Sequence, residues 1–478
     1  MGGSAGVFRV GTPFALEARI PMFEFGRELR RWFAGEILGP AHDGLTGGDG
    51  ALLELLELDL LRAEARSADI AAGRMNVRDR PQRQLEAAVV WREIARRTGD
   101  ALALRKAAAY AERAANGVGR ETWPRRWAGA RCEQALATLT GATLFGDDGL
   151  DAAADFAFVE AQRAAGASLP GVLAQAGRAH VAARAAMVAG DHTEALQAAA
   201  RFDGPIRALD TFARRGVSAA KLLAASARIE RAECLIACGQ RLKDADLLRF
   251  ALAGLDAAGA SLDPAYEPLT WARTALAVGQ ARSALGDLTG DIGEISDAVA
   301  GLVTVLEHIT RDHSPLDWAG AQLALAGALQ ALGEAGDNGR AFDQALGCYD
   351  RALMVLGDTP DLPLRACAAH ERVTCLVRRA ELSADLEMLD EAEASLRVEL
   401  TLADAAKDPV AWAVRQLSYA QICEARMAVL GFGEAEADAS VGVALSAALE
   451  VFGDHGRRSL ADAAARGLER MRFRMART

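Results

Sequence analysis

The sequence predicts an all-α protein: a right-handed α-solenoid of antiparallel helix pairs, with about eight units of about 47 residues each. Three observations support this fold class. A small-to-large apolar pattern repeats every 47 residues, prolines recur at nearly the same spacing, and the chain is 51% hydrophobic but only 5% aromatic. Alanine and leucine supply most of the apolar content, and both are strong helix formers, so close-packed helix pairs are favoured over a β-rich core.

The repeated pattern pairs a small residue with a larger one four positions later. Residues four apart lie on the same helix face, so the alanine lets a neighbouring helix approach and the larger side chain fills the space beside it. Glycines recur at the same spacing, and we expect them in the turn between the two helices of a unit. The pairs are Ala251/Leu255, Ala298/Leu302, Ala345/Tyr349, Ala392/Leu396 and Ala439/Val443, and the glycines are Gly239, Gly286 and Gly333.

Prolines mark the expected start of the first helix of each unit, because the N–H that proline lacks would be unpaired in a first helical turn. The interval between Pro170 and Pro268 has room for two units, the second starting near Val217. For the unit that starts at Pro315, we expect helices at 316–332 and 341–356. The helix-starting prolines are Pro81, Pro124, Pro170, Pro268, Pro315, Pro363 and Pro409, and a Trp follows four of them by three residues, at Trp127, Trp271, Trp318 and Trp412.

The segments outside the clear repeats divide the rest of the chain. Residues 1–21 are expected to be irregular, and 22–38 form an amphipathic helix with Phe25, Trp32 and Phe33 on its apolar face. Residues 39–50 form a Gly-rich linker. A degenerate repeat region covers 51–219 and begins with one long helix at 51–72. The clearer repeats cover 220–456, and the basic helix 457–478 caps the open end of the array.

The best repeats resemble a known family. Leu325, Ala326, Leu329 and Gly333 are similar to the first-helix signature of tetratricopeptide (TPR) repeats, and Ala345, Tyr349 and Ala352 match the second-helix signature. The resemblance is to long bacterial arrays of this family and covers about residues 220–450, and more weakly 81–219. Family units usually have 34 residues, and Arg231 and Arg372 stand where leucine is expected, so the register there is in doubt. HEAT-like or other α-solenoid pairs are the alternative.

The resemblance implies that the function lies in the concave wall formed by the first helices of successive units. No cluster of Arg or Lys dominates the corresponding positions, so an extended peptide or a partner helix is expected over a C-terminal carboxylate. The aromatic helix 22–38 is a second candidate, which could cap the solenoid, dock in the groove, or contact a partner or a membrane surface peripherally. The implied groove residues are Arg273, Gln280, Ser283, Leu323, Gln330, His370, Thr374, Gln421 and Glu424.

The charge distribution argues against nucleic-acid binding along the whole chain, whose net charge is −11. Residues 74–131 carry 14 Arg and Lys against 6 Asp and Glu, and residues 457–478 carry 7 Arg against two acidic residues. An acidic body with basic flanks leaves room for an acidic partner near either end, although solvated helix faces also explain such charge.

Motifs of catalysis and of cofactor binding are missing from the sequence, which has no phosphate loop, zinc-protease helix, nucleophile elbow or EF-hand loop. Cys234 and Cys238 lie four apart but lack a second ligand pair, so we expect no metal and no cofactor. We expect His308 and His313 to form a surface pair. Seven cysteines without a framework spacing, no signal peptide and no long apolar run predict a cytoplasmic protein without an integral membrane segment.

The leading hypothesis is therefore a non-enzymatic protein–protein interaction adaptor or scaffold, which binds a peptide or helix of a partner protein in its concave groove. One alternative is an enzyme built on a closed ring of helix pairs, an α/α toroid. The four tyrosines and the lack of clustered carboxylates argue against it. The other alternative is a sensor that binds a small ligand in the groove.

Overall fold

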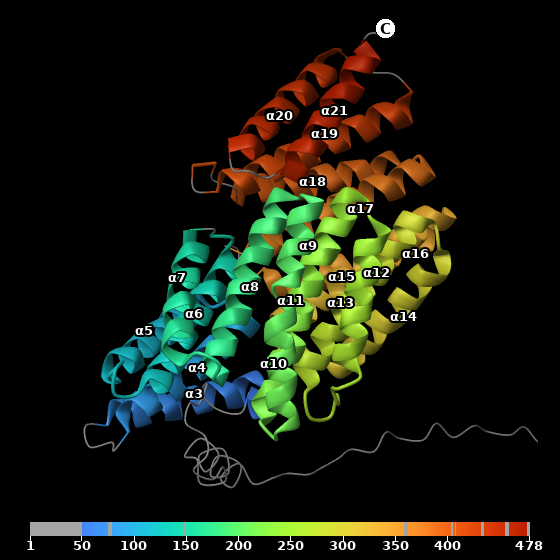
Figure 1. Ribbon diagram of the computed structural model, residues 1–478. Coiled ribbons are helices and arrows are strands. Elements are labelled where there is room, and N and C mark those ends of the chain that lie inside the picture. Colours follow the sequence, from blue (N-terminus) through green and yellow to red (C-terminus); the bar gives the residue numbers. More distant parts are fainter. Residues whose placement is uncertain are drawn as a thin grey trace, which may run out of the picture. The chain divides into compact units, whose positions relative to one another are not determined.

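Every regular element of the described chain is a helix (Figure 1). The computed structural model describes residues 50–475 apart from 75–78, 148, 358–361, 403, 404, 407, 432–434 and 455–457. The all-α class is confirmed. The expected helix 22–38 with Phe25, Trp32 and Phe33, and the linker before Gly50, lie outside the described residues. Among the described helices, none combines the length and the hydropathy that crossing a membrane requires.

Helix pairs follow one another along the described chain, and eight of them lie between Pro81 and residue 456, as predicted. We call the first helix of a pair helix A and the second helix B. The pairs are α4 (Arg80–Thr98) with α5 (Ala101–Gly117), α6 (Pro124–Phe145) with α7 (Gly149–Ala165), α8 (Leu169–Ala189) with α9 (His192–Ala200), α11 (Ser218–Leu242) with α12 (Ala245–Gly259), α13 (Pro268–Thr289) with α14 (Ile292–His308), α15 (Pro315–Gly336) with α16 (Gly339–Leu356), α17 (Pro363–Ser383) with α18 (Leu386–Leu402), and α19 (Pro409–Leu430) with α20 (Ala435–Asp454).

Four further helices of the described chain lie outside the pairs, and one of them was not expected. The helices α2 (Gly50–Glu54) and α3 (Leu58–Gly73) precede the pairs, and α21 (Arg458–Met475) follows them. The unexpected helix is α10 (Asp203–Arg214), which is inserted between α9 and α11 and buries Ile206 and Leu209. The start predicted near Val217 is confirmed, because Val217 is the N-cap residue of α11.

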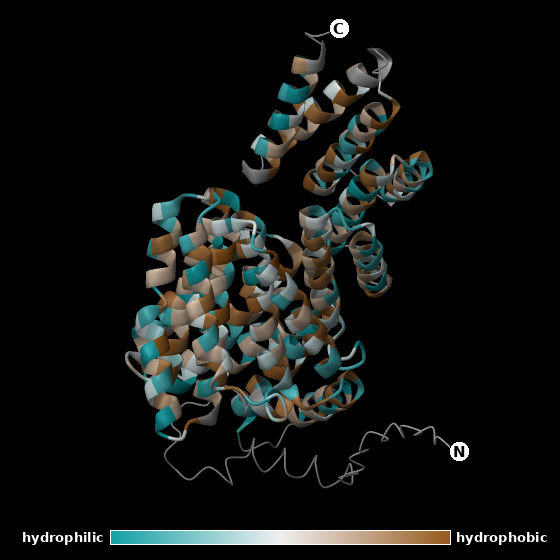
Figure 2. Ribbon diagram, turned by 90° about the vertical axis from the view of Figure 1, so that its right-hand side faces the viewer, coloured by the Kyte–Doolittle hydropathy of each residue, from teal (hydrophilic) through white to brown (hydrophobic). Residues whose placement is uncertain are grey.

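The prolines begin helix A as predicted. Five of them are the first residue of their helix, and Pro81 and Pro170 are the second. The Trp residues that follow them are half-buried at all four positions, so they line the junctions between helices without being enclosed. Hydrophobic residues are spread along the whole array (Figure 2), as expected when each pair buries its apolar face against the next.

The 47-residue pattern of small and large residues forms the core of four units. The alanines from Ala251 to Ala392 and their partners at i+4 are at most 3% exposed. The pattern is wrong in the last unit, where Ala439 is exposed and Val443 is 71% exposed. Val441 and Leu445 are buried instead, because α20 begins four residues after its left-handed residue Gly431, whereas the four B helices before it begin two residues after theirs.

The recurring glycines are not in the turns, which corrects that expectation. Gly286 and Gly333 lie inside helix A, where a Cβ would come 2.6 Å from Ile295 and 2.9 Å from Phe342. They therefore let helix B approach helix A closely. The turns use a left-handed residue four positions later, which also recurs every 47 residues: Lys243, Gly290, Asp337, Ala384 and Gly431.

Polar caps begin several of the B helices. The side chains of Asp244 and Asn338 accept N–H bonds from the first turn of α12 and α16. Asp291, the N-cap residue of α14, accepts from the backbone of Gly293 at 2.9 Å. A cap satisfies N–H groups that have no partner inside the helix, so each turn fixes where helix B starts.

The expected long helix at 51–72 is wrong, since α2 and α3 are separate. The break falls at 55–57, and the carbonyl oxygens of Leu53, at the end of α2, and of Leu56, within the break, accept bonds from Arg97 of α4, both at 2.6 Å. These carbonyl oxygens thus bond to a side chain of another helix, between the end of α2 and the start of α3.

The A helices close on one another early in the array. Contacts run in sequence order from α4 through α6, α8, α11 and α13 to α15, and α15 also contacts α4. A solenoid unit normally contacts only its neighbours, so this contact is a departure from a simple stack. It is the arrangement that the toroid alternative requires, although the array continues past it through α17 to α21.

Candidate functional site

A buried polar network holds α4 against the residues around the start of α15. Arg97 of α4 is fully buried, and its Nε donates to Glu93 at 2.6 Å. Its other nitrogens donate to the carbonyl oxygens of Leu53 and Leu56, both at 2.6 Å, and of His313 at 3.4 Å. One guanidinium therefore connects α2, α4 and the loop before α15.

Asp317 joins three helices within the same network. It accepts two bonds from Arg273 of α13, at 2.9 and 2.7 Å, one from Arg96 of α4 at 3.4 Å, and one from the Ser314 hydroxyl at 2.6 Å. Burial raises the pKa of Asp317. Burial also opposes ionisation of Glu93, but the two guanidinium groups beside it hold its pKa well below the usual range. The network is thus a set of mutually paired charges, of which Arg97 is fully buried and the others are half-buried.

Glu54 places a carboxylate at the N-terminus of α13, where unpaired N–H groups favour an anion. It accepts from the backbone N–H groups of Leu269 at 3.2 Å and Thr270 at 3.0 Å, and from the Thr270 hydroxyl. Burial raises its pKa to about 7, while the bonds from Thr270 lower it. The Glu54 carbonyl oxygen lies 2.6 Å from Nε2 of His313, which is half-buried. The surface-pair expectation is therefore wrong for His313.

Polar pairs also join successive A helices along one surface of the array. Each pair links a side chain of one A helix to a side chain of the next, or to α21 at the end. We call the surface that these residues line the A-helix wall. The pairs are Arg92–Glu133, His180–Glu230, Arg273–Asp317, His370–Ser418, Thr374–Gln421 and Glu424–Arg470.

Two glutamates on the A-helix wall are exposed, yet neighbouring protein raises the pKa of their carboxyl groups. Glu371 of α17 is exposed, yet burial raises its pKa to about 7. Glu233 of α11 is also exposed, and its pKa is likewise raised to about 7, with His180 opposing the shift. Enough protein therefore lies near both carboxylates to disfavour their charged forms. Burial also lowers the pKa of the neighbouring His370 to about 4.

The predicted groove residues of the first two units lie on α13 and α15. Arg273 is engaged with Asp317, as described above. Gln280 and Ser283 are half-buried, and within the described chain their side chains have no hydrogen-bond partner. Leu323 packs against two apolar clusters, and Gln330 accepts a bond from Tyr349 at 3.3 Å. Of this set, only Gln280 and Ser283 keep polar side chains without a partner in the described part of the chain.

The predicted groove residues of the last two units are paired with each other or with the end of the array. His370 bonds to Ser418 at 2.6 Å, and Thr374 bonds to Gln421 at 3.2 Å. Glu424 accepts from Arg470 of α21 at 3.0 Å. Thus α17 brings His370 and Thr374 together with α19, and Glu424 lies apart from them, against α21.

Sequence reasoning did not identify Glu371 or the network around Arg97. Glu371 stands one period of 47 residues after Ala324 and one before Ser418, so a charged residue where the neighbouring units have small residues was the available signal. Arg97 gave no signal, because most of its partners are backbone carbonyl oxygens of segments far away in the chain.

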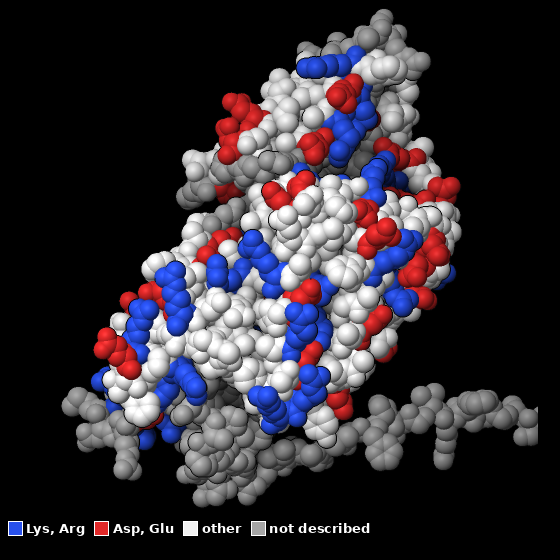
Figure 3. Space-filling model, in the orientation of Figure 1, with Lys and Arg blue, Asp and Glu red and all other residues white. Residues whose placement is uncertain are grey.

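Neither the surface charge nor the metal-ligating side chains of the described residues mark out a site. On the face shown in Figure 3, Lys and Arg are interspersed with Asp and Glu, and large uncharged areas lie between them. Among the described residues, no three His, Cys, Asp or Glu side chains are grouped so as to hold a metal ion. Cys234 and Cys238 are buried.

Comparisons with known proteins give distant similarities in structure alone. No family model and no curated protein matches the chain. It is similar to a Rap protein complexed with Competence and Sporulation Factor, with 11% identity and a TM-score of 0.44 over 83% of this chain and 99% of that chain. It is similar to an IFIT1 monomeric mutant with m7Gppp-AAAA, with 12% identity and a TM-score of 0.43 over 94% and 95%. The human IFIT1 dimer with PPP-AAAA has 15% identity and a TM-score of 0.38 over 95% and 94%.

Proposed function

We propose that the chain is a non-enzymatic, tetratricopeptide-like adaptor that binds a peptide or helix of a partner protein along the A-helix wall. The observation that supports this best is the pair of carboxylates Glu233 and Glu371, which are solvent-exposed although protein surrounds them. A concave wall built from stacked helices presents side chains from several units to one extended partner. Peptide recognition needs such a surface and no reactive group.

The unpaired polar residues are proposed to make the direct contacts. Gln280 and Ser283 have free donor and acceptor groups, which suit the backbone of an extended peptide. Leu323 offers an apolar contact in the next unit. The remaining predicted residues are bonded to other side chains of the array, and their solvent-facing atoms are proposed to contact the partner. They are Arg273, Gln330, His370, Thr374, Gln421 and Glu424.

The charge of the wall favours a protein over a nucleic acid. Glu230, Glu233 and Glu371 contribute acidic groups, and Arg92 and Arg273 are each already paired with a carboxylate. Phosphate binding depends on unpaired Lys and Arg, which release counterions when they meet the backbone. A neutral or basic peptide segment is therefore the proposed ligand.

A peptide-display experiment tests this function. The probe is a random 12-residue peptide library selected on the full chain, and the enriched peptides are synthesised with a fluorophore for anisotropy titration. Gln280→Arg and Ser283→Arg place bulk and charge on the wall and are expected to weaken binding at least tenfold. Val303→Arg is the matched control, because Val303 is 43% exposed on helix B of the same unit and should leave affinity unchanged. Enriched peptides that bind both wall variants like the wild type would contradict the proposal.

The aromatic segment 22–38 is proposed as a second contact for the partner. Phe25, Trp32 and Phe33 lie on one face of its predicted helix, in a chain that has few aromatic residues. Deleting 22–38 should reduce the affinity of the selected peptides if this segment contributes to the groove. Equal affinity with and without the segment would show that it takes no part in peptide binding.

A further inference from the structure

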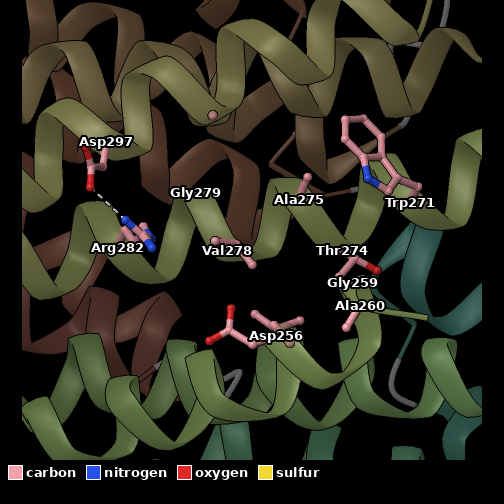
Figure 4. A pocket seen from close by; sticks show the side chains of 12 residues that line it. Asp256, Gly259, Ala260, Trp271, Thr274, Ala275, Val278, Gly279, Arg282 and Asp297 are labelled. Carbon is pink, nitrogen blue, oxygen red and sulfur yellow. Dashed lines mark hydrogen bonds and ion pairs between the residues drawn. The ribbon is translucent and has the colours of Figure 1, made fainter. Parts of the chain in front are cut away.

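A cavity of about 350 Å³ lies between α12 and α14, on the side of α13 that packs against the B helices. Trp271 and Val278 of α13 line it, together with Asp256 of α12 and with Asp297 and Gly301 of α14. Figure 4 shows Asp256 approaching from one side and Asp297, paired with Arg282, from the other. The residues that line this cavity differ from those of the A-helix wall.

The cavity exists because this unit lacks side chains that the next unit has. One period of 47 residues later, Gln322 stands in place of Ala275 and Cys348 in place of Gly301. Gln322 is buried, and it accepts a bond at 3.1 Å from Arg351, which also donates to the Cys348 sulfur at 2.9 Å. An arginine thus fills the equivalent space one unit on.

The same place is filled by an arginine again two units on. The left-handed cap residues keep the period of 47 through α17, so residues 94 apart are equivalent. Arg372 donates from α17 to Asp350 at 2.6 Å, to Glu391 at 3.0 Å and to the Ser395 hydroxyl at 3.3 Å. Its guanidinium thereby joins the B helices on both sides. Counting back two periods, Arg372 corresponds to Val278, Asp350 to Asp256, Glu391 to Asp297 and Ser395 to Gly301.

In two other units an arginine at the Val278 position has an acidic partner. Arg372 stands against Asp350 two units on, and in the intervening unit both positions are apolar, with Leu325 and Val303. One period before Val278, Arg231 pairs with Asp203 at 3.1 Å, and its guanidinium lies 4.5 Å from the Phe250 ring centre. Both of these arginines, Arg231 and Arg372, are therefore paired with acidic residues.

The Val278 position breaks this match, because an acidic residue stands opposite it without an arginine, and the arginine that lines the cavity, Arg282, is paired with Asp297. Asp256 is exposed, and within the described chain its side chain has no hydrogen-bond or ion-pair partner. Asp297 already pairs with Arg282 at 2.9 Å. Val278 is apolar and cannot neutralise the free carboxylate. The lining consequently includes an unpaired negative charge near Val278, and the indole ring of Trp271 lies farther along the pocket (Figure 4).

We propose that this cavity binds an arginine side chain of a protein partner. The Asp256 carboxylate pairs with the guanidinium, as Asp350 does with Arg372, and a carboxylate and a guanidinium can form two parallel hydrogen bonds. Trp271 and Val278 contact the hydrocarbon stem and the flat face of the guanidinium. The site lies outside the A-helix wall, so its test is independent of the proposed function.

Fluorine NMR of the full chain labelled with 5-fluorotryptophan tests this proposal. The Trp271 resonance is assigned with Trp271→Phe, and the probe is N-acetyl-arginine amide, compared with the neutral citrulline analogue of the same shape. The arginine derivative is expected to shift the Trp271 resonance saturably, and the citrulline derivative to bind at least tenfold more weakly. Equal titration by the two compounds, or no shift with arginine, overturns the proposal.

Three variants make the test specific to the cavity. Asp256→Asn removes the charge from an exposed position and is expected to weaken arginine binding at least tenfold. Asp246→Asn removes an exposed carboxylate from the same helix and is expected to change the affinity less than twofold. Val278→Arg supplies an internal guanidinium and is expected to abolish binding. Retention of wild-type affinity by Asp256→Asn, or by Val278→Arg, overturns the proposal.

Discussion

Arg97 is predicted to keep α2 and the start of α3 bound to the rest of the array. Its side chain is fully buried and makes four hydrogen bonds, three of them to backbone carbonyl oxygens of other segments. Arg97→Met keeps an apolar stem of similar length but leaves the carbonyl oxygens of Leu53 and Leu56 without their donor.

The expected loss follows from the burial of this group. Removing one partner of a buried, hydrogen-bonded charge typically costs about 3–5 kcal/mol. Glu93 keeps Arg96 as a partner, at 2.6 Å, so the lower end of this range applies. About 3 kcal/mol corresponds to a little over a hundredfold change in a local opening equilibrium.

Hydrogen exchange measured by mass spectrometry gives a local readout of this loss. The amide of Leu58 donates to the carbonyl oxygen of Asp312 at 3.2 Å, so a peptide that spans 55–61 reports whether the segment is bound. Exchange of this peptide is expected to become about a hundredfold faster in Arg97→Met. Arg105→Met is the control, because Arg105 is exposed on α5 and should leave the peptide unchanged. An unchanged exchange rate in Arg97→Met would refute the reasoning.

Three further predictions concern the same fold. The folded-state pKa of Glu54, about 7, is above its ordinary value of 4.5, so the stabilisation from its bound proton is full below pH 4.5 and is lost as the pH rises through 7. The unfolding free energy of the wild type should therefore fall by about 3 kcal/mol between pH 4.5 and pH 7, and that of Glu54→Gln should not. Identical pH profiles of the two proteins in denaturation would contradict this. Gly333→Ala should lower the unfolding free energy by about 1–3 kcal/mol, because its Cβ would come 2.9 Å from Phe342. Gly336→Ala, whose Cβ would have nothing within 4 Å, should be neutral or stabilising. Equal melting temperatures of the two variants would contradict the close approach of the helices at Gly333. Asp291→Ala should lower the unfolding free energy by about 1 kcal/mol, because it removes the cap of α14. Asp287→Ala, inside α13, should change it by less than about 0.5 kcal/mol. Thermal melts that rank the two variants in the opposite order would contradict the role of Asp291 as a cap.

The periodic features of the fold could be predicted from the sequence, and the closed contact could not. Pro315 and its equivalents marked the helix starts because proline has a local conformational preference that neighbouring packing does not override. Gly333 showed the period but not its role, since glycine serves both in turns and at close helix contacts. The bonds from Arg97 to Leu53 and Leu56 join segments whose proximity depends on the curvature of the whole array, and no local pattern encodes that curvature.

The candidate sites divide in the same way. His370 and Thr374 could be placed on the A-helix wall by their position in the repeat, and the structure shows them paired with Ser418 and Gln421. Glu371, one residue away, was missed because its raised pKa depends on how much protein surrounds it, which the sequence does not state. Whether these wall residues bind a partner stays a prediction that the library experiment addresses.

A repeat array allows an inference that a unique fold does not, because each unit is an internal control for the others. Positions one or two periods apart have the same structural task, so the cost of a departure can be judged within one molecule. The unit that contains Val278 gives up the contacts that Arg372 makes two units later and leaves Asp256 unpaired beside a cavity. Local rules are typically broken where a function compensates for the loss. A guanidinium from another protein would restore both the packing and the charge match, whereas a partner without a cation would restore only the packing.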